Sequence, residues 1–167
     1  MSLELKLDVS ELNAFAKSME GLNAVMLDEQ RAAMQKSLAI LEQAVTVRTP
    51  VNAGTLRQAW SSQITGSPAL LTGETFNPLT YAWPVEAGRK PGKMPPSGSE
   101  GLLLWVQRKL GLTGTSARSA AYLIARKIGQ VGTKGAFMLR EGWNEAEPLI
   151  IKIHEAIPAK VLDKLAR

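Results

Sequence analysis

The sequence predicts an α+β fold with one domain, residues 1–167, in which helices and strands occupy separate stretches of the chain. Three observations predict it. Apolar residues alternate with polar ones near the N-terminus, two strand-like stretches flank a Gly-Ser-Pro turn in the middle, and helical periodicity fills most of the rest. Because helices and strands do not alternate along the chain, a parallel sheet of βαβ units is excluded.

The first expected element is an N-terminal strand over residues 3–9. Its apolar residues recur at every second position, which would place them on one face; they are Leu3, Leu5, Leu7 and Val9. Ser10 follows as a helix N-cap, because its side-chain oxygen can accept a free N–H of the first helical turn. The sequence therefore predicts a short strand that leads directly into a helix.

Two long helices are expected after the strand. Gly21 and Asn23 end or kink the first of them. The second runs from about Asn23 to Arg48 and carries one apolar stripe, which consists of Leu27, Met34, Leu38, Leu41 and Val45. Pro50 ends it, since a residue that precedes proline disfavours the helical conformation.

A small antiparallel hairpin is expected at about 56–76. One strand runs from Leu56 to about Thr65 and the other from Ala69 to Phe76, with Gly66-Ser67-Pro68 as the turn. So short a connection cannot cross over, so the two strands must be antiparallel. A third extended segment is expected to begin at residues 80–83.

Residues 87–100 are expected to form a flexible surface loop, because they are basic and rich in glycine and proline. The C-terminal part is expected to be helical. It comprises a short helix over 102–110, a helix from Thr115 or Ser116 to near Gly129, a turn at 132–135, a long helix over 139–157 and a short helix from Pro158.

The helix expected over 139–157 has an apolar face at helical spacing, formed by Trp143, Ala146, Ile150, Ile153 and Ile157. Pro148 falls inside this helix and is expected to kink or split it, because proline lacks the N–H that a helix interior needs.

The composition excludes several classes of protein. The chain has no cysteine, which excludes disulfide frameworks, cysteine-ligated zinc sites, iron–sulfur clusters and cysteine nucleophiles. Its single histidine excludes metal sites with several histidine ligands. The longest purely apolar run, residues 102–106, is too short to span a bilayer. The N-terminus lacks the apolar core of a signal peptide. We therefore expect a soluble protein that is made in a cytoplasm and makes no membrane contact.

The net charge of +5 is unevenly distributed. Residues 1–48 carry five basic and seven acidic side chains, whereas residues 88–140 carry ten basic side chains against Glu100 alone. The ten are Arg89, Lys90, Lys93, Arg108, Lys109, Arg118, Arg126, Lys127, Lys134 and Arg140. Such a region attracts phosphates or an acidic protein face, although it could also be only a solvated face that keeps the protein soluble.

No enzyme motif is present. His154 has no nucleophile elbow elsewhere in the chain and is expected to be a surface or structural histidine. Glu141, Glu145 and Glu147 suit the positive end of a helix dipole better than acid–base catalysis. Residues 129–135 lack the Lys-Ser/Thr end of a P-loop. We therefore expect no catalysis, cofactor or metal. The tryptophans are expected to be core or interface anchors; they are Trp60, Trp83, Trp105 and Trp143.

Three segments resemble the signatures of a family of tailed-phage neck and tail-completion proteins, which includes those similar to minor tail protein Z. Residues 49–57, T-P-V-N-A-G-T-L-R, resemble its T-P-V-D-T-G-x-L-R. Residues 81–88, Y-A-W-P-V-E-A-G, resemble Y-A-x-x-V-E-x-G. Residues 122–128 and 132–137 resemble its I-A-R-K-I…G-x-K-G-x-P-F ending, with Ala136 in place of proline.

The resemblance implies a structural virion-assembly protein of a tailed bacteriophage or prophage. Members act at the neck or tail end in tail completion or head–tail joining, through contacts with other phage tail or neck proteins, and are built into a homo-oligomeric ring. The implied location is the host bacterial cytoplasm during assembly and then the virion. In this comparison the helix over 102–110 resembles an insertion typical of longer members.

Nine residues are the candidate protein-interaction site under this hypothesis: Arg57, Trp83, Glu86, Arg89, Lys90, Lys93, Arg126, Lys127 and Lys134. The acidic residues 1–48 of one subunit could pair head to tail with the basic residues 88–140 of the next. The alternative is a nucleic-acid-binding protein that uses the basic 88–140 region, for example on DNA that passes through a neck.

Overall fold

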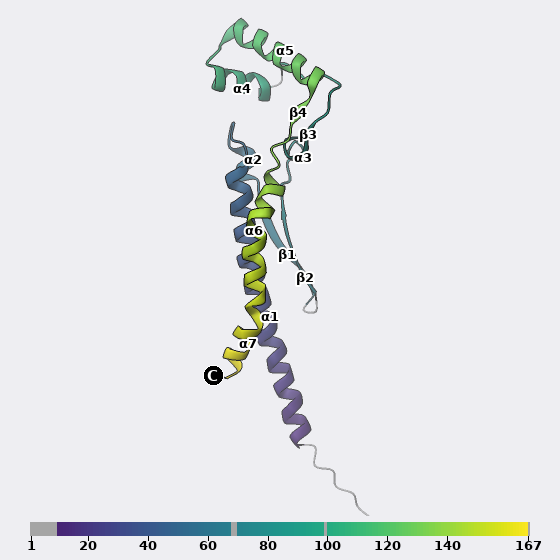
Figure 1. Ribbon diagram of the computed structural model, residues 1–167, viewed down its shortest axis with the longest axis vertical. Coiled ribbons are helices and arrows are strands. Elements are labelled where there is room, and N and C mark those ends of the chain that lie inside the picture. The colour runs from purple at the N-terminus through teal and green to yellow at the C-terminus, as the bar shows by residue number, and fades with distance from the viewer. Residues whose placement is uncertain (1–9, 68–69, 99, 167) are drawn as a thin grey trace, which may run out of the picture. The chain divides into compact units, whose positions relative to one another are not determined.

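The computed structural model describes residues 10–67, 70–98 and 100–166 (Figure 1). The predicted α+β class is confirmed, with a long N-terminal helix, a small antiparallel sheet and C-terminal helices. The expected strand over 3–9 lies outside the described residues. The chain forms two compact units, and α1 (Ser10–Arg48) and α6 (Met138–Glu155) each contribute to both.

The N-terminal helical region is one helix rather than two. α1 continues through Gly21 and Asn23 without interruption, so the expected break is wrong. A glycine inside a helix costs about 1 kcal/mol relative to alanine. That cost is too small to end a helix whose neighbours on both sides are helix formers. The expected apolar stripe is confirmed at its C-terminal end, where Leu38, Leu41 and Val45 are buried.

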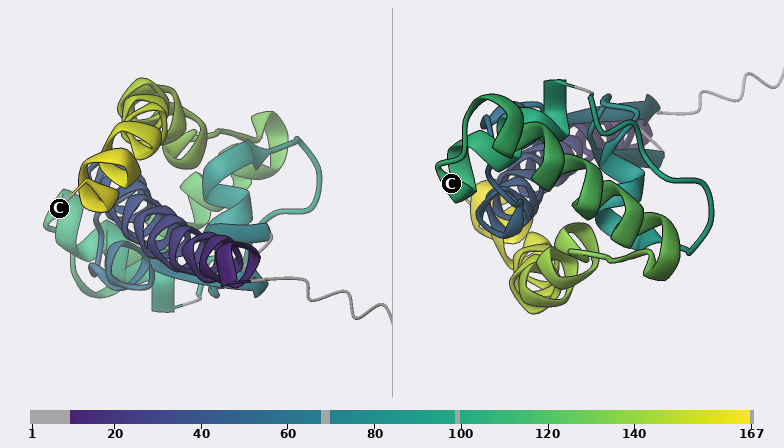
Figure 2. Two further views of the ribbon diagram at one scale, coloured as in Figure 1. Left: turned by 90° about the horizontal axis from the view of Figure 1, so that it is seen from below. Right: turned by 90° about the horizontal axis from the view of Figure 1, so that it is seen from above.

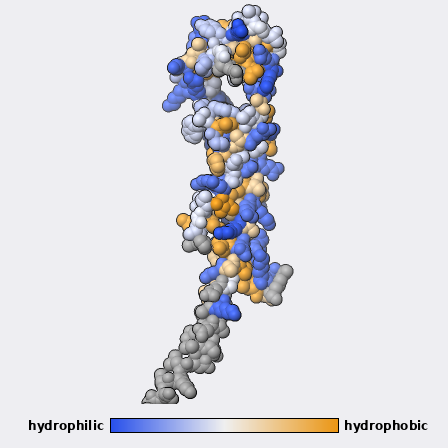
Figure 3. All heavy atoms as spheres, turned by 180° about the vertical axis from the view of Figure 1, so that it is seen from behind, coloured by the Kyte–Doolittle hydropathy of each residue, from blue (hydrophilic) through white to orange (hydrophobic). Residues whose placement is uncertain are grey.

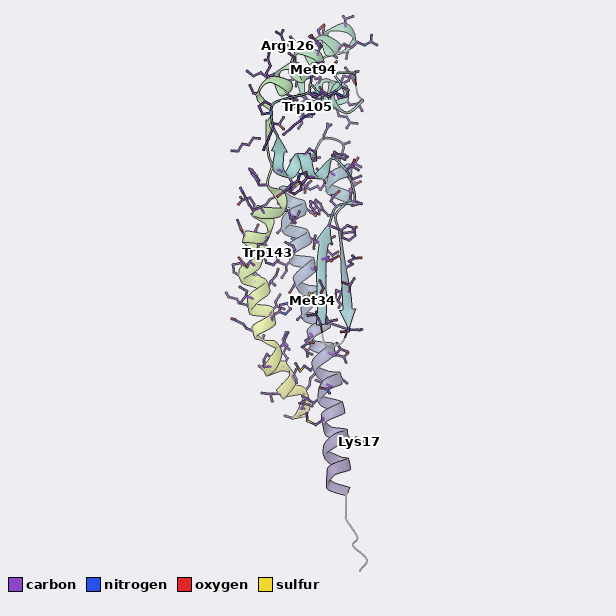
Figure 4. All side chains as sticks on the ribbon, turned by 90° about the vertical axis from the view of Figure 1, so that its right-hand side faces the viewer. Lys17, Met34, Met94, Trp105, Arg126 and Trp143 are labelled. Carbon is purple, nitrogen blue, oxygen red and sulfur yellow. The ribbon has the colours of Figure 1, made fainter. Side chains whose placement is uncertain are left out.

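The first unit combines α1 up to Ile40, the hairpin residues Ser62–Glu74 and the chain from Ala146 onward. The hairpin consists of β1 (Ser61–Ser67) and β2 (Leu70–Phe76). Figure 4 shows it beside α1 at the level of Met34. A side chain on Gly73 would collide with Met34 and crowd Leu38, so glycine lets β2 lie directly on the helix.

The hairpin is shorter than expected at its first strand. Residues Thr55–Gln58 form a one-turn helix, α2, where the sequence predicted the start of a strand from Leu56. Gly54 has a φ of +87°, which reverses the chain, and the N–H groups of Gln58 and Ala59 donate to the carbonyls four residues earlier. The alternation over residues 56–60 therefore reflects a helical turn with Leu56 and Trp60 buried.

The C-terminal helices of the first unit pack on α1. α6 runs through Pro148 as one helix, and α7 (Ile157–Leu165) follows it with a proline near its start. The Lys164 ammonium pairs with Glu29 of α1 at 2.6 Å. The view from below shows α7 beside α1 (Figure 2). The split expected at Pro148 is not observed, because α6 is continuous through this residue.

The buried face of α6 matches the predicted stripe at Ala146, which is buried, and at Ile150 and Ile153, which are half-buried, but not at its first position. Met138, Gly142 and Ala146 are buried at intervals of four residues, whereas Trp143 is 44% exposed. Gly142 lies against the backbone and side chain of Val45, where no side chain would fit. A small residue that permits close helix packing does not register as apolar in a sequence pattern, so the stripe was begun at Trp143 rather than at Gly142.

The second unit contains Leu41–Ser61 and Thr75–Glu145. Residues Ala82–Ala87 form α3 where an extended segment was expected. The Ala82 N–H donates to Leu79 and the Val85 N–H to Tyr81, which closes the turn. Pro84 lies in the first turn, where a missing N–H costs nothing. The restriction that proline places on the preceding residue is overridden here.

A two-residue antiparallel ladder joins distant parts of this unit. β3 (Gly88–Arg89) pairs with β4 (Thr133–Lys134), in the register Gly88 with Lys134 and Arg89 with Thr133. The sequence predicted a loop and a turn at these positions. Two residues are too few to show a strand periodicity, so only the tertiary structure reveals the pairing.

Two helices lie between β3 and β4. α4 (Glu100–Leu110) confirms the helix expected over 102–110, and α5 (Gly114–Val131) begins just before the expected Thr115 or Ser116. They pack as a helical pair (Figure 2) around a core whose fully buried members are Val106, Ala117 and Ala121. Alanines on α5 let the larger side chains of α4 approach closely.

Within the described residues, none of the helices combines the length and the apolar character that crossing a membrane requires.

Candidate interaction surface

The first motif segment lines a pocket in the second unit. Residues 50–56 form one wall, and α4 forms the opposite wall. The pocket has a volume of about 450 Å³ and is mainly apolar. Its other lining residues are Tyr81, Val85, Gly101, Leu104, Trp105 and Arg108. The motif therefore forms a concave surface rather than only a chain reversal.

Buried polar contacts fix the start of this segment. The Thr49 hydroxyl donates to the Val45 carbonyl at 2.8 Å and accepts the indole N–H of Trp60 at 2.8 Å. Both side chains are buried. The Thr49 side chain thus satisfies a carbonyl at the end of α1 and the polar atom of a core tryptophan, as buried polar groups require.

Arg57, one of the nine predicted interaction residues, is engaged within the chain. Its guanidinium donates to the carbonyls of Thr46 at 2.8 Å and Val47 at 3.4 Å. These carbonyls lie in the last turn of α1, where a cation is favourable. Arg57 therefore caps α1 and orients the pocket loop, and a free guanidinium is not presented to a partner.

The rim of the pocket is apolar and accessible. Val51, Tyr81 and Leu104 are exposed large hydrophobic residues. Arg108 donates to the carbonyl of Asn52 at 3.4 Å, which joins α4 to the motif loop. Apolar surface of this kind, with an aromatic residue and an arginine at its edge, has the composition of a protein-binding site.

Glu86 of the second motif is also engaged within the chain. Its carboxylate accepts the backbone N–H of Leu139 at 2.9 Å and that of Arg140 at 3.2 Å. These N–H groups belong to the first turn of α6, where no helical carbonyl can reach them. Glu86 therefore caps α6 from a distant part of the sequence.

Glycines let the second and third motifs meet. Gly88 has a φ of +79°, and a side chain there would overlap the carbonyl of Thr133. A side chain on Gly135 would overlap the carbonyl of Glu86. Two backbone bonds complete the contact, from Ala136 N–H to Val85 at 2.8 Å and from Phe137 N–H to Glu86 at 3.1 Å.

Six of the predicted cations gather near this junction. The ladder sets Arg89 beside Thr133, and the Gly92 N–H donates to the Gly129 carbonyl at 2.8 Å, which ties the loop to the end of α5. All six are exposed. We call them the cationic cluster: Arg89, Lys90, Lys93, Arg126, Lys127 and Lys134.

None of the six members of the cationic cluster forms an ion pair within the part of the chain that the structure describes. The Arg89 guanidinium donates a hydrogen bond to the Lys93 carbonyl at 2.6 Å. Figure 3 shows strongly hydrophilic and hydrophobic residues side by side on the α4–α5 part of the surface. Figure 4 places Arg126 near Met94. The cluster can therefore attract an anion or an acidic protein face.

Trp83 is the ninth predicted residue, and its side chain is 73% exposed on α3. An exposed tryptophan suits an interface anchor, because such residues dominate binding energy once they are buried. The structure therefore divides the predicted set into an exposed tryptophan, the cationic cluster and two residues, Arg57 and Glu86, that hold the second unit together.

His154 and Glu145, which were considered as potential catalytic residues, each contact a side chain of α1. The Ser37 hydroxyl donates to the Ala33 carbonyl at 2.9 Å, so it accepts from Nε2 of His154 at 3.1 Å. Glu145 pairs with Arg48. Among residues 10–67, 70–98 and 100–166, no group of three or more metal-ligating side chains comes together. His154 is therefore a satisfied structural residue.

Sequence reasoning missed the pocket residues on α4. Leu104 and Arg108 are four residues apart and so project from one helix face; that spacing is the signal by which they could have been found. Comparison of the chain with protein-family models, curated proteins and solved structures finds no match.

Proposed function

We propose that this chain is a structural virion-assembly protein of a tailed bacteriophage or prophage. It acts at the neck or tail end, in tail completion or head–tail joining, through protein–protein contacts. The observation that supports this best is that all three family-like segments belong to one compact unit. Residues 81–88 and 132–137 contact each other directly through the β3–β4 ladder and the neighbouring backbone bonds.

The exposed residues of that unit are of the kind that binds proteins. Trp83 and the pocket rim supply apolar anchors, and the cationic cluster supplies charge that is not neutralised by described carboxylates. Protein interfaces combine aromatic anchors with arginine and a polar rim. The proposed partners are other phage tail or neck proteins with acidic faces, and further copies of the chain in a ring.

Deletion of the gene from the phage or prophage that encodes it tests the function. Electron microscopy of the lysate after induction is expected to show heads and tails that are unjoined or incompletely terminated, and a plasmid copy is expected to restore joined particles. Normal numbers of complete infectious particles from the deletion strain would refute the proposal.

Variants connect the phenotype to the surface. Leu104→Glu at the pocket rim and Trp83→Ala on α3 are each expected to lower the yield of infectious particles at least tenfold without loss of helical content by circular dichroism. Leu162→Glu is the matched control, because Leu162 is exposed on α7 in the first unit. Equal yields for Leu104→Glu and the control would contradict a role for the pocket.

Nucleic-acid binding is a second candidate, supported by the exposure of the cationic cluster and by the fact that its members form no ion pair with a described residue. Phosphate-driven binding weakens steeply as salt rises. A mobility-shift assay with duplex DNA is therefore expected to show binding at low salt that Lys90→Glu/Lys93→Glu abolishes and Lys152→Glu/Lys160→Glu preserves. Absence of any shift at about 50 mM salt would exclude this candidate.

A further inference from the structure

The β1–β2 hairpin is a sheet with open edges. Within the described residues no third strand joins it, and each strand therefore has one outer edge. A two-stranded hairpin is marginally stable by itself, and an unpaired edge is a template for another strand. One face already has a cover, because Gly73 of β2 lies against Met34 and Leu38 of α1.

Residues 3–9 have the sequence of a strand that would match this sheet. Leu3, Leu5, Leu7 and Val9 alternate with charged residues. The segment has the same length as β1 and β2, seven residues each. Its alternation would place apolar side chains on one face and charges on the other.

The hairpin of the same chain is beyond the reach of this segment. The part of the hairpin next to its turn lies beside Arg31 of α1, because Arg31 lines one cavity together with Gly66 and Leu71. Ser10 and Arg31 are joined by continuous helix, which at 1.5 Å per residue separates them by about 31 Å. Residue 3 extends at most about 24 Å from Ser10. Even at full extension, the segment would therefore end short of the part of its own hairpin that lies beside Arg31.

The faces of the hairpin match the pattern of the segment. Ile64 and Leu71 turn toward α1 and line a cavity of about 210 Å³ with Arg31 and Gln35. Gln63 and Thr72 are exposed on the opposite face. A strand with leucines toward α1 and charges toward solvent would continue both faces, and a register shift of one residue would reverse them.

We propose that residues 3–9 of one copy of this chain add as a third strand to the β1–β2 hairpin of a second copy. Backbone hydrogen bonds to an open edge supply the affinity, and the alternating leucines set the register. The exchange is either reciprocal, which gives a closed dimer, or directional, which gives a ring. The inference goes beyond the proposed function, because it applies whatever particle or process the chain serves.

Disulfide trapping tests the proposal directly, because the chain has no native cysteine. A chain with Lys6→Cys is mixed with a differently tagged chain with Gln63→Cys or Thr72→Cys, and the mixture is oxidised. A mixed disulfide is expected with Gln63→Cys if the β1 edge is used and with Thr72→Cys if the β2 edge is used. Lys17→Cys, an exposed site on α1, is the control. Yields no higher than those of the control for both partners would overturn the proposal.

Oligomeric state provides the second test. Wild-type protein is expected to associate in light scattering, and Leu5→Asp/Leu7→Asp is expected to be monomeric at the same concentration. Glu4→Gln/Asp8→Asn is the matched control and is expected to remain associated. Helical content by circular dichroism verifies that α1 and the rest of the fold persist. A wild-type monomer at every concentration, or an aspartate variant that associates as strongly as wild type, would overturn the proposal.

Discussion

The carboxylate of Glu86 caps α6 by accepting the backbone N–H of Leu139 at 2.9 Å, across more than fifty residues of sequence. The neighbouring backbone bonds from Ala136 to Val85 and from Phe137 to Glu86 hold the same junction. A single side chain thus links the segment that contains α3 to the start of the last long helix. Removal of the Glu86 side chain is therefore expected to lower the stability of the fold.

Glu86→Ala is expected to lower the free energy of unfolding by about 1–2 kcal/mol, because two helix N–H groups lose a charged acceptor. Urea denaturation followed by circular dichroism measures the change. Glu147→Ala, at an exposed position of the same helix, is the control and is expected to change stability by less than about 0.5 kcal/mol. Equal effects of the two substitutions would show that the cap contributes no stability.

Thr49→Val is expected to destabilise the chain by about 1–3 kcal/mol, because the buried Trp60 indole N–H would lose its acceptor while the side-chain volume stays similar. Thr115→Val, on the exposed surface of α5, is the matched control. The urea midpoints of both variants give the comparison. A Thr49→Val variant as stable as the control would mean that another group accepts the indole N–H.

Gly88→Ala is expected to cost at least about 2 kcal/mol, because a φ of +79° with extended ψ is nearly restricted to glycine and the new Cβ would overlap the Thr133 carbonyl. Gly98→Ala is the control, since its added Cβ meets no atom within 4 Å. Limited proteolysis between α3 and α6 is expected to accelerate for Gly88→Ala alone. Equal protease resistance would contradict the tight β3–β4 approach.

Lys164→Gln is expected to destabilise the first unit in a pH-dependent way. The hydrogen bond and charge of Lys164 lower the pKa of Glu29, and the hydrogen bond and charge of Glu29 raise the pKa of Lys164. A lowered carboxyl pKa stabilises the fold above the ordinary glutamate pKa, and this contribution is lost as pH falls through the lowered value. A raised lysine pKa stabilises below the ordinary lysine pKa and is lost as pH rises through the raised value.

The difference in urea midpoint between wild type and Lys164→Gln is therefore expected to be greatest at neutral pH. It should shrink in acid, where Glu29 takes up its proton, and again in strong alkali, where Lys164 loses its proton. High salt should reduce it as well, because the ion pair is partly exposed. Lys152→Gln is the control, and a pH-independent difference would contradict the Glu29 pairing.

The sequence predicted those elements whose periodicity is local and long. α4, α5, α6 and the part of α1 after Asn23 follow from apolar stripes of several turns, and the hairpin follows from a turn signal between two alternating runs. Residues 82–87 did not follow the rule that a residue before proline is extended, because the turn bonds to Leu79 and Tyr81 override that preference. The β3–β4 ladder is too short to have any period.

The candidate site likewise contains residues whose role the sequence could predict and residues whose role it could not. The cationic residues were identifiable because charge at the surface needs no partner, and all six members of the cluster are exposed. The roles of Arg57 and Glu86 depend on the ends of helices that lie elsewhere in the sequence. Their charge alone therefore predicted that they would contact a partner protein. Phe137, with a φ of +49° and its ring 3.9 Å from the Arg140 guanidinium, likewise has no sequence signal.

The β3–β4 ladder makes residues 90–132 a segment whose length and structure can change without altering the junction that holds its two ends. Arg89 and Thr133 are paired in the ladder, so the chain that leaves β3 at Arg89 comes back beside it at Thr133. The backbone before Arg89 and after Thr133 therefore keeps its position whatever lies between them. The entropic cost of closing such a stretch grows only with the logarithm of its length. The α4–α5 pair can therefore be lengthened, shortened or replaced by a tight turn while α3 and the start of α6 keep their junction. Variation in this segment would change one wall of the pocket at little cost to folding.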